Sequence, residues 1–151
     1  MLADDLSPNR LKQAKYQIQE LLRYLRGERV GLVGFTGVAF LESPLTVDYA
    51  SLEYFLDFLE PEEQYIKGTN IEEALSVSFE ALQQSERGII YLITDGENFT
   101  GNYKNILSKM NNHQIVIVGI GSENGSMIKT SRGLKRDYFG KPVLSKLNKK
   151  Y

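Results

Sequence analysis

The stretch that decides the fold is Ile89-Ile90-Tyr91-Leu92-Ile93-Thr94-Asp95-Gly96-Glu97, an apolar run that ends in a carboxylate and breaks at glycine. Such a run predicts a buried β-strand over residues 88–94, with Asp95 at its carboxyl end. In open α/β sheets, ligands bind beyond the carboxyl ends of the strands. Asp95 is therefore the strongest candidate for a functional residue.

A second candidate lies upstream in Gly68-Thr69-Asn70, a turn that opens a helix and offers the hydroxyl of Thr69. A carboxylate and a hydroxyl make an oxygen-only ligand set, which Mg²⁺ or Mn²⁺ prefers. Each residue also has a structural interpretation. Asp95 can cap the turn after its strand, and Thr69 can be the N-cap of the helix.

The first half of the chain predicts a helix, a hairpin and a second helix. Ser7-Pro8 indicates a helix start, and apolar residues at a spacing of three to four extend that helix over residues 8–26. Residues 30–35 and 38–41 read as an antiparallel hairpin that Pro44 ends. The second helix is capped by Asp48, with inward residues Leu52, Phe55, Leu56 and Leu59.

The second half alternates helices and strands. We expect helices over residues 70–84 and 103–110, strands over 88–94 and 114–120, and a small hairpin over 138–144. Separated apolar strands linked by helices predict an α/β fold with a mostly parallel sheet and helices on both faces. At 151 residues, the chain is expected to be a single domain over 1–151.

Composition excludes several classes of site. The chain has no cysteine, which excludes disulfides, thiolate zinc sites and thiol catalysis. No apolar run reaches the roughly 18–20 residues that span a bilayer, and no signal peptide precedes the first helix, so the chain as given is expected to be soluble.

Charge is distributed unevenly along the chain. Residues 127–151 hold eight basic residues and one acid, a net charge of +7, so the rest carries −8 because the whole chain carries −1. This segment is either a polyanion-binding tail or a solvated end that balances an acidic body. The wide spacing of its basic residues favours the solvated end, so we expect no nucleic-acid partner.

The remaining candidates are weaker. Glu97 reads as an exposed loop acid, and His113, the only histidine, as a turn residue after two asparagines. Gly119-Ile120-Gly121-Ser122 follows a strand but lacks the lysine and spacing of a phosphate-binding loop. With one histidine and no cysteine, no pairing of a nucleophile with a base can be proposed.

Several short motifs in order resemble one known family, the von Willebrand factor type A domains, and within it the bacterial Bat (aerotolerance operon) proteins. The motifs are Pro8-Asn9-Arg10-Leu11 with Ala14-Lys15, Arg29-Val30-Gly31-Leu32-Val33, Pro44-Leu45-Thr46 with Asp48, Gly68-Thr69-Asn70-Ile71 with Ala74-Leu75, Thr94-Asp95-Gly96-Glu97, and Val118-Gly119-Ile120-Gly121-Ser122. The resemblance covers nearly the whole chain.

The resemblance implies a Rossmann-like fold with an antiparallel edge hairpin and a metal-ion-dependent adhesion site. The family's loop threonine matches Thr69 and its loop aspartate matches Asp95. In members with a full site, these residues and an Asp-x-Ser-x-Ser motif hold Mg²⁺, and a carboxylate of a partner protein completes the coordination. The implied activity is protein binding, not catalysis.

The chain departs from the family pattern at its start. Met1 falls where the methionine after Asp-x-Ser-x-Ser falls, so this chain would be a truncated domain that lacks the central first strand and its ligands. We therefore expect weak or no binding of Mg²⁺ or Mn²⁺ at Thr69 and Asp95. The strands over 30–35 and 89–94 would then pair with each other, accept another chain, or leave the domain unstable. The resemblance to the Bat proteins also implies a parent protein anchored in the bacterial inner membrane, through segments that this chain is expected to lack.

Three functions follow as alternatives. The leading one is a protein-interaction module with an incomplete metal site, which is not an enzyme. The second is a small Mg²⁺-dependent α/β hydrolase or phosphotransferase that uses Asp95. The third is a fragment with no function of its own.

Overall fold

The computed structural model describes residues 1, 3–60, 68–96, 106, 108, 112–130, 133–134, 136 and 138–147. The chain divides into two compact units. Unit 1 comprises Met1–Ile18, Leu92–Glu97 and Ile117–Tyr151, and unit 2 comprises Gln19–Tyr91 and Asn98–Val116. The predicted helix over 103–110 lies outside the described residues, apart from Ile106 and Ser108.

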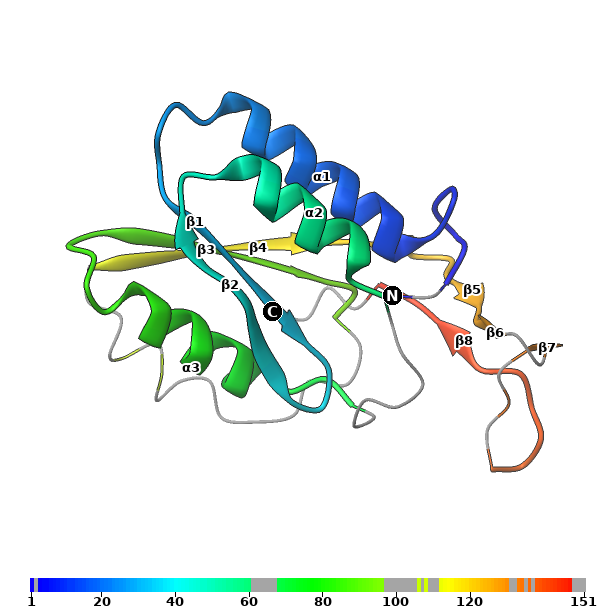
Figure 1. Ribbon diagram of the computed structural model, residues 1–151. Helices are drawn as coiled ribbons and strands as arrows, with labels where there is room; N and C mark the ends of the chain where they lie inside the picture. Colours follow the sequence, from blue (N-terminus) through cyan, green and yellow to red (C-terminus); the bar gives the residue numbers. More distant parts are fainter. Residues whose placement is uncertain are drawn as a thin grey trace. The chain divides into compact units, whose positions relative to one another are not determined.

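Unit 2 is built on a hairpin of β1 (Val30–Phe35) and β2 (Ala39–Thr46), which pair antiparallel as predicted. The helices α2 (Tyr49–Phe58) and α3 (Ile71–Leu82) both pack against this hairpin and lie on either side of it in Figure 1. Their buried apolar residues form most of the core of this unit: Leu52, Leu56, Ile71, Ala74, Leu75 and Leu82.

Two helices in unit 2 begin after a side chain that caps them. The Asp48 carboxylate accepts a hydrogen bond from the Ser51 amide at 3.1 Å, which confirms the predicted cap of α2. The Asn70 side chain accepts one from the Glu73 amide at 3.1 Å and caps α3. Thr69 is therefore not the cap of α3, and that structural interpretation of its hydroxyl is wrong.

Two details of unit 2 differ from expectation. Pro44 does not end the second strand, because β2 continues to Thr46 past register shifts opposite Val30–Val33. Proline is tolerated at such irregular strand positions since the lost N–H is not needed in the ladder. Phe55 does not face inward: it is 43% exposed, whereas Leu56 is 1% exposed.

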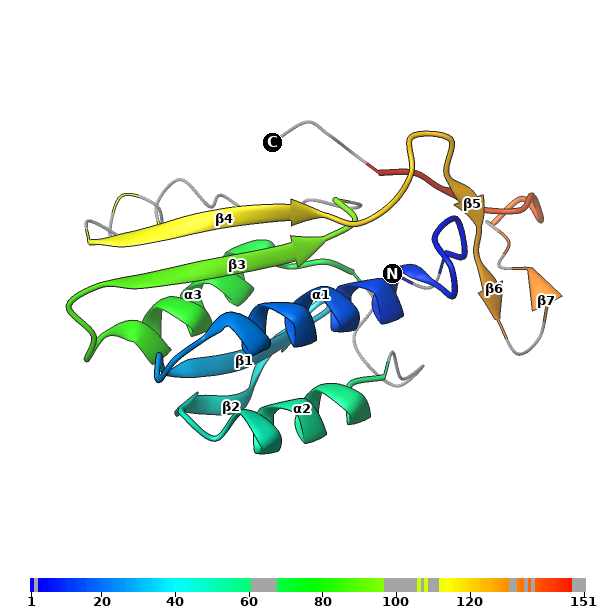
Figure 2. The ribbon, with the colours of Figure 1, turned by 90° about the horizontal axis from the view of Figure 1, so that it is seen from above.

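Three elements continue from one unit into the other along the chain: α1 (Arg10–Tyr24), β3 (Gly88–Thr94) and β4 (His113–Gly119). β3 and β4 pair with each other and run in the same direction in Figure 2, as the mostly parallel α/β fold requires. β1 and β3 belong to separate two-stranded sheets in the part of the chain that the structure describes, so they do not pair with each other.

The start of α1 differs from the prediction by two residues. The helix begins at Arg10, not at Pro8, and the Asn9 side chain accepts a hydrogen bond from the Lys12 amide at 2.9 Å. Asn9 thus caps the helix in place of Ser7. Asparagine is among the preferred N-cap residues because its side-chain oxygen can accept a hydrogen bond from a backbone N–H of the first turn. The shift makes Arg10 the first helical residue.

The last third of unit 1 is a series of short antiparallel pairs. β5 (Ser126–Met127) pairs with β8 (Leu144–Ser145), and β6 (Lys129–Thr130) pairs with β7 (Gly133–Leu134). An isolated bridge between Arg136 and Pro142 closes the turn beyond them, in the place of the predicted hairpin over 138–144. A second bridge, between Ala3 and Ile128, ties the N-terminal segment to this series.

Candidate functional site

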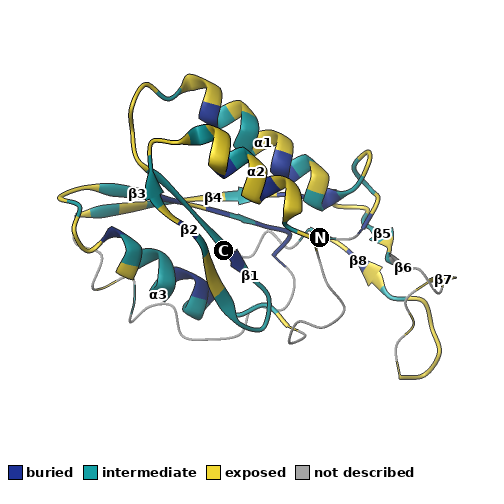
Figure 3. Ribbon diagram, viewed as in Figure 1, coloured by how far each residue is buried: buried dark blue, intermediate teal, exposed yellow. Residues whose placement is uncertain are grey.

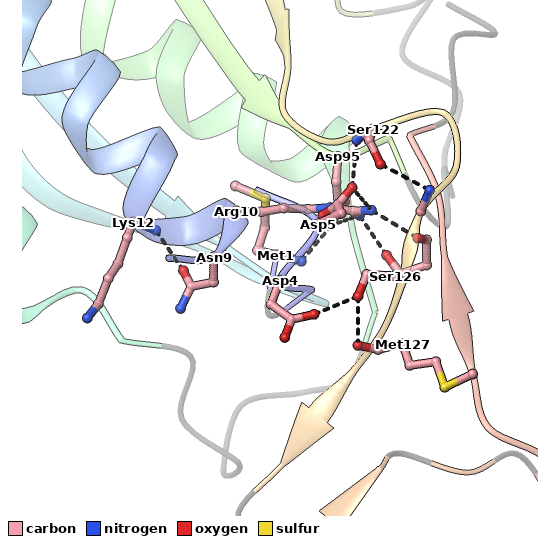
Figure 4. A network of polar contacts seen from close by, with 12 residues as sticks. Met1, Asp4, Asp5, Asn9, Arg10, Lys12, Asp95, Ser122, Ser126 and Met127 are labelled. Carbon is pink, nitrogen blue, oxygen red and sulfur yellow. Dashed lines mark hydrogen bonds and ion pairs between the residues drawn. The ribbon is translucent and has the colours of Figure 1, made fainter. Parts of the chain in front are cut away.

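Asp95 follows the last residue of β3, as the sequence predicts, and is only 5% exposed. The turn after it is held by Thr94, whose hydroxyl accepts a hydrogen bond from the Gly96 amide at 3.1 Å. Gly96 has a φ of 71°, in the left-handed region that glycine adopts without strain. The carboxylate at this strand end is directed into a buried polar network of unit 1, shown in Figure 4.

The centre of this network is the guanidinium group of Arg10, which has no exposed surface. Its contacts are Nε to Asp5 Oδ1 at 2.8 Å, Nη2 to Asp5 Oδ2 at 3.1 Å, Nη1 to Asp95 Oδ2 at 3.3 Å, Nη1 to Ser145 Oγ at 2.6 Å and Nη2 to the Ser145 carbonyl at 3.0 Å. An arginine side chain has five N–H donors, and these contacts engage one each.

Gly121 makes room for this guanidinium. A Cβ at this position would lie 3.0 Å from Nε and 3.1 Å from Cζ of Arg10, and the glycine has a φ of 148°. Any other residue here would be strained by the backbone conformation and would crowd the guanidinium group. Of the two glycines in Gly119-Ile120-Gly121, Gly121 thus lies against the buried arginine, whereas Gly119 lies against Leu147.

Asp5 is the main counter-ion of Arg10. Its carboxylate also accepts a hydrogen bond from the Ser122 amide at 2.6 Å. Burial raises the pKa of Asp5, but the hydrogen bonds from Arg10 and the Ser122 amide outweigh that effect and hold the pKa well below its usual range. Asp5 is therefore fully charged at neutral pH, which matches the buried guanidinium.

A second cation reaches Asp95. The α-ammonium group of Met1 lies 2.5 Å from Asp95 Oδ2, the same oxygen that Arg10 contacts. The network thus sets two carboxylates, those of Asp5 and Asp95, against two positive groups. A divalent cation at Asp95 would have to compete with positive charge that is already in place.

The donor set does not fit a complete metal centre. The oxygen chemistry of Asp95 suits Mg²⁺ or Mn²⁺, but its single negative charge is already matched by the buried Arg10. Among the described residues, no three His, Cys, Asp or Glu side chains lie close enough together to hold a metal ion.

Thr69, the other predicted ligand, belongs to unit 2 and is half-buried. Its loop is positioned by the Asn70 amide, which donates a hydrogen bond to the Thr36 carbonyl at 2.7 Å, and by Gly68, whose φ is 133°. The assignment of Thr69 and Asp95 to one metal site stays a prediction.

The weaker candidates have structural roles or lie outside the described residues. His113 is the first residue of β4 rather than a turn residue, and its ring packs edge-on to Phe79 with centroids 5.8 Å apart. Its Nδ1 atom is buried and has no hydrogen-bond partner among the described residues. Glu97 lies outside the described residues.

Three residues of this site were not identified from the sequence: Arg10, Asp5 and Ser145. Arg10 falls on an amphipathic helix, where a charged residue is ordinarily placed toward solvent. Its partners Asp95 and Ser145 are 85 and 135 residues away in sequence, so no local spacing could reveal them. The nearest local signal was the acidic pair Asp4-Asp5 shortly before the helix.

The family of this chain is shown by its similarity to known proteins. The family model for the von Willebrand factor type A domain matches residues 1–97. This chain belongs to the von Willebrand factor type A domain family. The match includes α1, the β1–β2 hairpin, α2, α3 and β3 with Asp95, which are the parts of the fold that precede residue 98.

Two solved structures resemble this von Willebrand factor type A domain over 98% of its length, each with a TM-score of 0.90 and 32% sequence identity. One is the conserved hypothetical protein BatB from Bacteroides thetaiotaomicron, of which 75% is covered. The other is an aerotolerance-related membrane protein from Bacteroides fragilis, of which 76% is covered. No curated protein matches the chain. Within the described residues, no helix is both long enough and apolar enough to cross a membrane.

Replacement of Arg10 by lysine is expected to destabilise the domain by about 3–5 kcal/mol. Lysine retains the charge, but it cannot engage Asp5 through two nitrogens while also reaching Asp95 and Ser145. Chemical denaturation followed by circular dichroism measures the loss. The matched control is Arg23→Lys on the same helix, where the arginine side chain is 71% exposed and pairs with Glu20. A loss in Arg23→Lys as large as that in Arg10→Lys would contradict a special role for the buried guanidinium.

Stability is expected to fall on acidification because the folded state lowers the pKa of Asp5. A depressed pKa contributes stability above the unfolded value of about 4 and loses it as the pH drops further. The free energy of unfolding of the wild-type chain should fall between about pH 5 and pH 2. In Asp5→Asn this fall should be smaller than in wild type by on the order of 2 kcal/mol. Asp4→Asn, at an exposed neighbouring acid, is the control and should retain the steep wild-type dependence. Parallel pH profiles for wild type and Asp5→Asn would refute this assignment.

Proposed function

We propose that this domain is a protein-interaction module and that it does not turn over a substrate. The observation that carries the proposal is the position of Asp95, the strongest candidate for chemistry, whose buried carboxylate is paired with the guanidinium group of Arg10. Membership of a family whose domains commonly bind other proteins supports the same conclusion.

We further propose that docking involves the carboxyl end of β3 and the Thr69 loop, with a carboxylate of the partner protein as the group recognised. Thr69 and Asp95 would supply oxygen ligands if Mg²⁺ or Mn²⁺ takes part. One hydroxyl and one committed carboxylate form a small fraction of an octahedral shell, so binding of the ion is weak or absent. The affinity for the partner then rests on protein contacts.

We place this interaction at a bacterial membrane, through segments outside the chain. The support is the similar protein from Bacteroides fragilis, which is described as an aerotolerance-related membrane protein. The domain itself would act beside the membrane and bind a protein there, not a nucleic acid.

Addition of MgCl₂ or MnCl₂ is expected to leave the thermal midpoint unchanged below about 1 mM. The reason is that the buried guanidinium group of Arg10 already pairs with the Asp95 carboxylate. Asp95→Asn and Thr69→Ala serve as comparisons, each measured as its own change on metal addition, because Asp95→Asn also alters the ion pairs. A rise at micromolar metal that is lost in both variants would show a complete site and overturn this part of the proposal.

Partner docking can be tested by placing a photo-crosslinking amino acid at position 69 in the full-length protein in its own cells. We expect one discrete adduct with another protein. The matched position is Tyr24, which is 75% exposed on α1 and should give none. Chelation of divalent cations by EDTA should leave most of the adduct intact, because the protein contacts carry the affinity. Identical adducts from positions 69 and 24, or no adduct at all, would count against an interaction module.

A further inference from the structure

The outer face of α2 exposes three aromatic side chains. Tyr54, Phe55 and Phe58 are 62%, 43% and 68% exposed. They are mutually ordered, since the Tyr54 ring lies 4.6 Å from that of Phe58 and 6.2 Å from that of Phe55, between centroids. In Figure 3, exposed and buried stretches alternate along α2, and the buried residues of this helix are Leu52 and Leu56. Ordered exposed aromatics are the side chains that most often carry the energy of protein interfaces.

This aromatic face lies in a strongly acidic part of the sequence. Residues 30–66 contain seven acidic residues and no lysine or arginine, a net charge of −7. Two of the acids, Glu53 and Asp57, are in α2 itself and alternate with the aromatics. The occupant of such a face has to combine apolar or aromatic anchors with positive charge.

The same chain contains a segment that combines positive charge with exposed aromatic side chains. Residues 127–151 carry a net charge of +7. Within this segment Tyr138 is 98% exposed and Phe139 is 84% exposed, and their rings form an edge-to-face pair 5.7 Å apart. The turn that presents them is closed by the Arg136–Pro142 bridge and by Arg136 Nη1, which donates a hydrogen bond to the Gly140 carbonyl at 2.6 Å.

We propose that the acidic aromatic face of α2 binds the basic aromatic turn around Tyr138 and Phe139 of a second copy of this chain. The α2 face is acidic and the turn is basic, and both expose aromatic side chains. Lysine and arginine side chains near the turn would lie over the faces of Tyr54 and Phe58, a favourable arrangement for cations and aromatic rings. This association is separate from the docking proposed at Asp95.

The contact is heterologous, because different surfaces of the two copies meet. Each bound copy leaves one free α2 face and one free turn, so association continues from copy to copy. Wild-type protein is therefore expected to sediment as a series of species that grows with concentration. Opposite charges drive much of the encounter, so raising NaCl from about 50 mM to about 500 mM should weaken association at least about tenfold.

Two double variants separate the two surfaces. Tyr54→Ser with Phe58→Ser removes the face and keeps the turn, whereas Tyr138→Ser with Phe139→Ser removes the turn and keeps the face. Each alone should associate at least about tenfold more weakly than wild type by sedimentation velocity. Tyr24→Ser, at an aromatic on α1 that is 75% exposed, is the control and should behave as wild type.

Mixing the two double variants in equal amounts is the deciding measurement. Each variant supplies the surface that the other lacks, so the mixture should form a dimer and no larger species. The dissociation constant of this dimer should be close to that of a single contact between two wild-type chains. Recovery of this dimer also shows that both variants are folded. A wild-type chain that stays monomeric at low salt, a mixture without dimer, or an equal loss in Tyr24→Ser would overturn the proposal. The docking experiment at position 69 is unaffected by any of these results.

Discussion

A guanidinium group with no exposed surface can persist only if each of its N–H donors meets an acceptor and its charge is balanced. In this domain the requirement falls on Arg10, and it is met by Asp5, Asp95 and Ser145. The three acceptors come from the N-terminal segment, the end of β3 and β8. Loss of one partner of such a cluster leaves an uncompensated buried charge, which costs more than the intact contact contributes. The arrangement of unit 1 depends on this constraint.

The same constraint explains the chemistry of the strand end. A carboxylate at the carboxyl end of a parallel strand is well placed to bind a ligand. Here that carboxylate is an acceptor for Arg10 and for the Met1 ammonium group, and Gly121 leaves the room that the guanidinium needs. The chain belongs to the von Willebrand factor type A domain family, whose domains commonly bind other proteins.

Most of the regular structure was predictable from local pattern. The run over 88–94 is β3 with the bounds expected, and α2 begins after its predicted cap, Asp48. The cap of α3 is Asn70 and not Thr69. The errors lie where tertiary contacts override local preference. Pro44 stays within β2 because the hairpin is irregular there, and Phe55 faces outward because Leu52 and Leu56 already fill the side of α2 that faces the hairpin.

The sequence by itself determined the α/β class, the family, the strand that carries Asp95 and the loop that carries Thr69. These follow from periodicity, caps and short motifs, which act over a few residues. Only the tertiary structure decided what Asp95 contacts, because Arg10 lies 85 residues away and looks like any charged residue on an amphipathic helix. Burial of a charge is a property of the whole fold. A linear pattern cannot state which distant groups will be present to balance that charge.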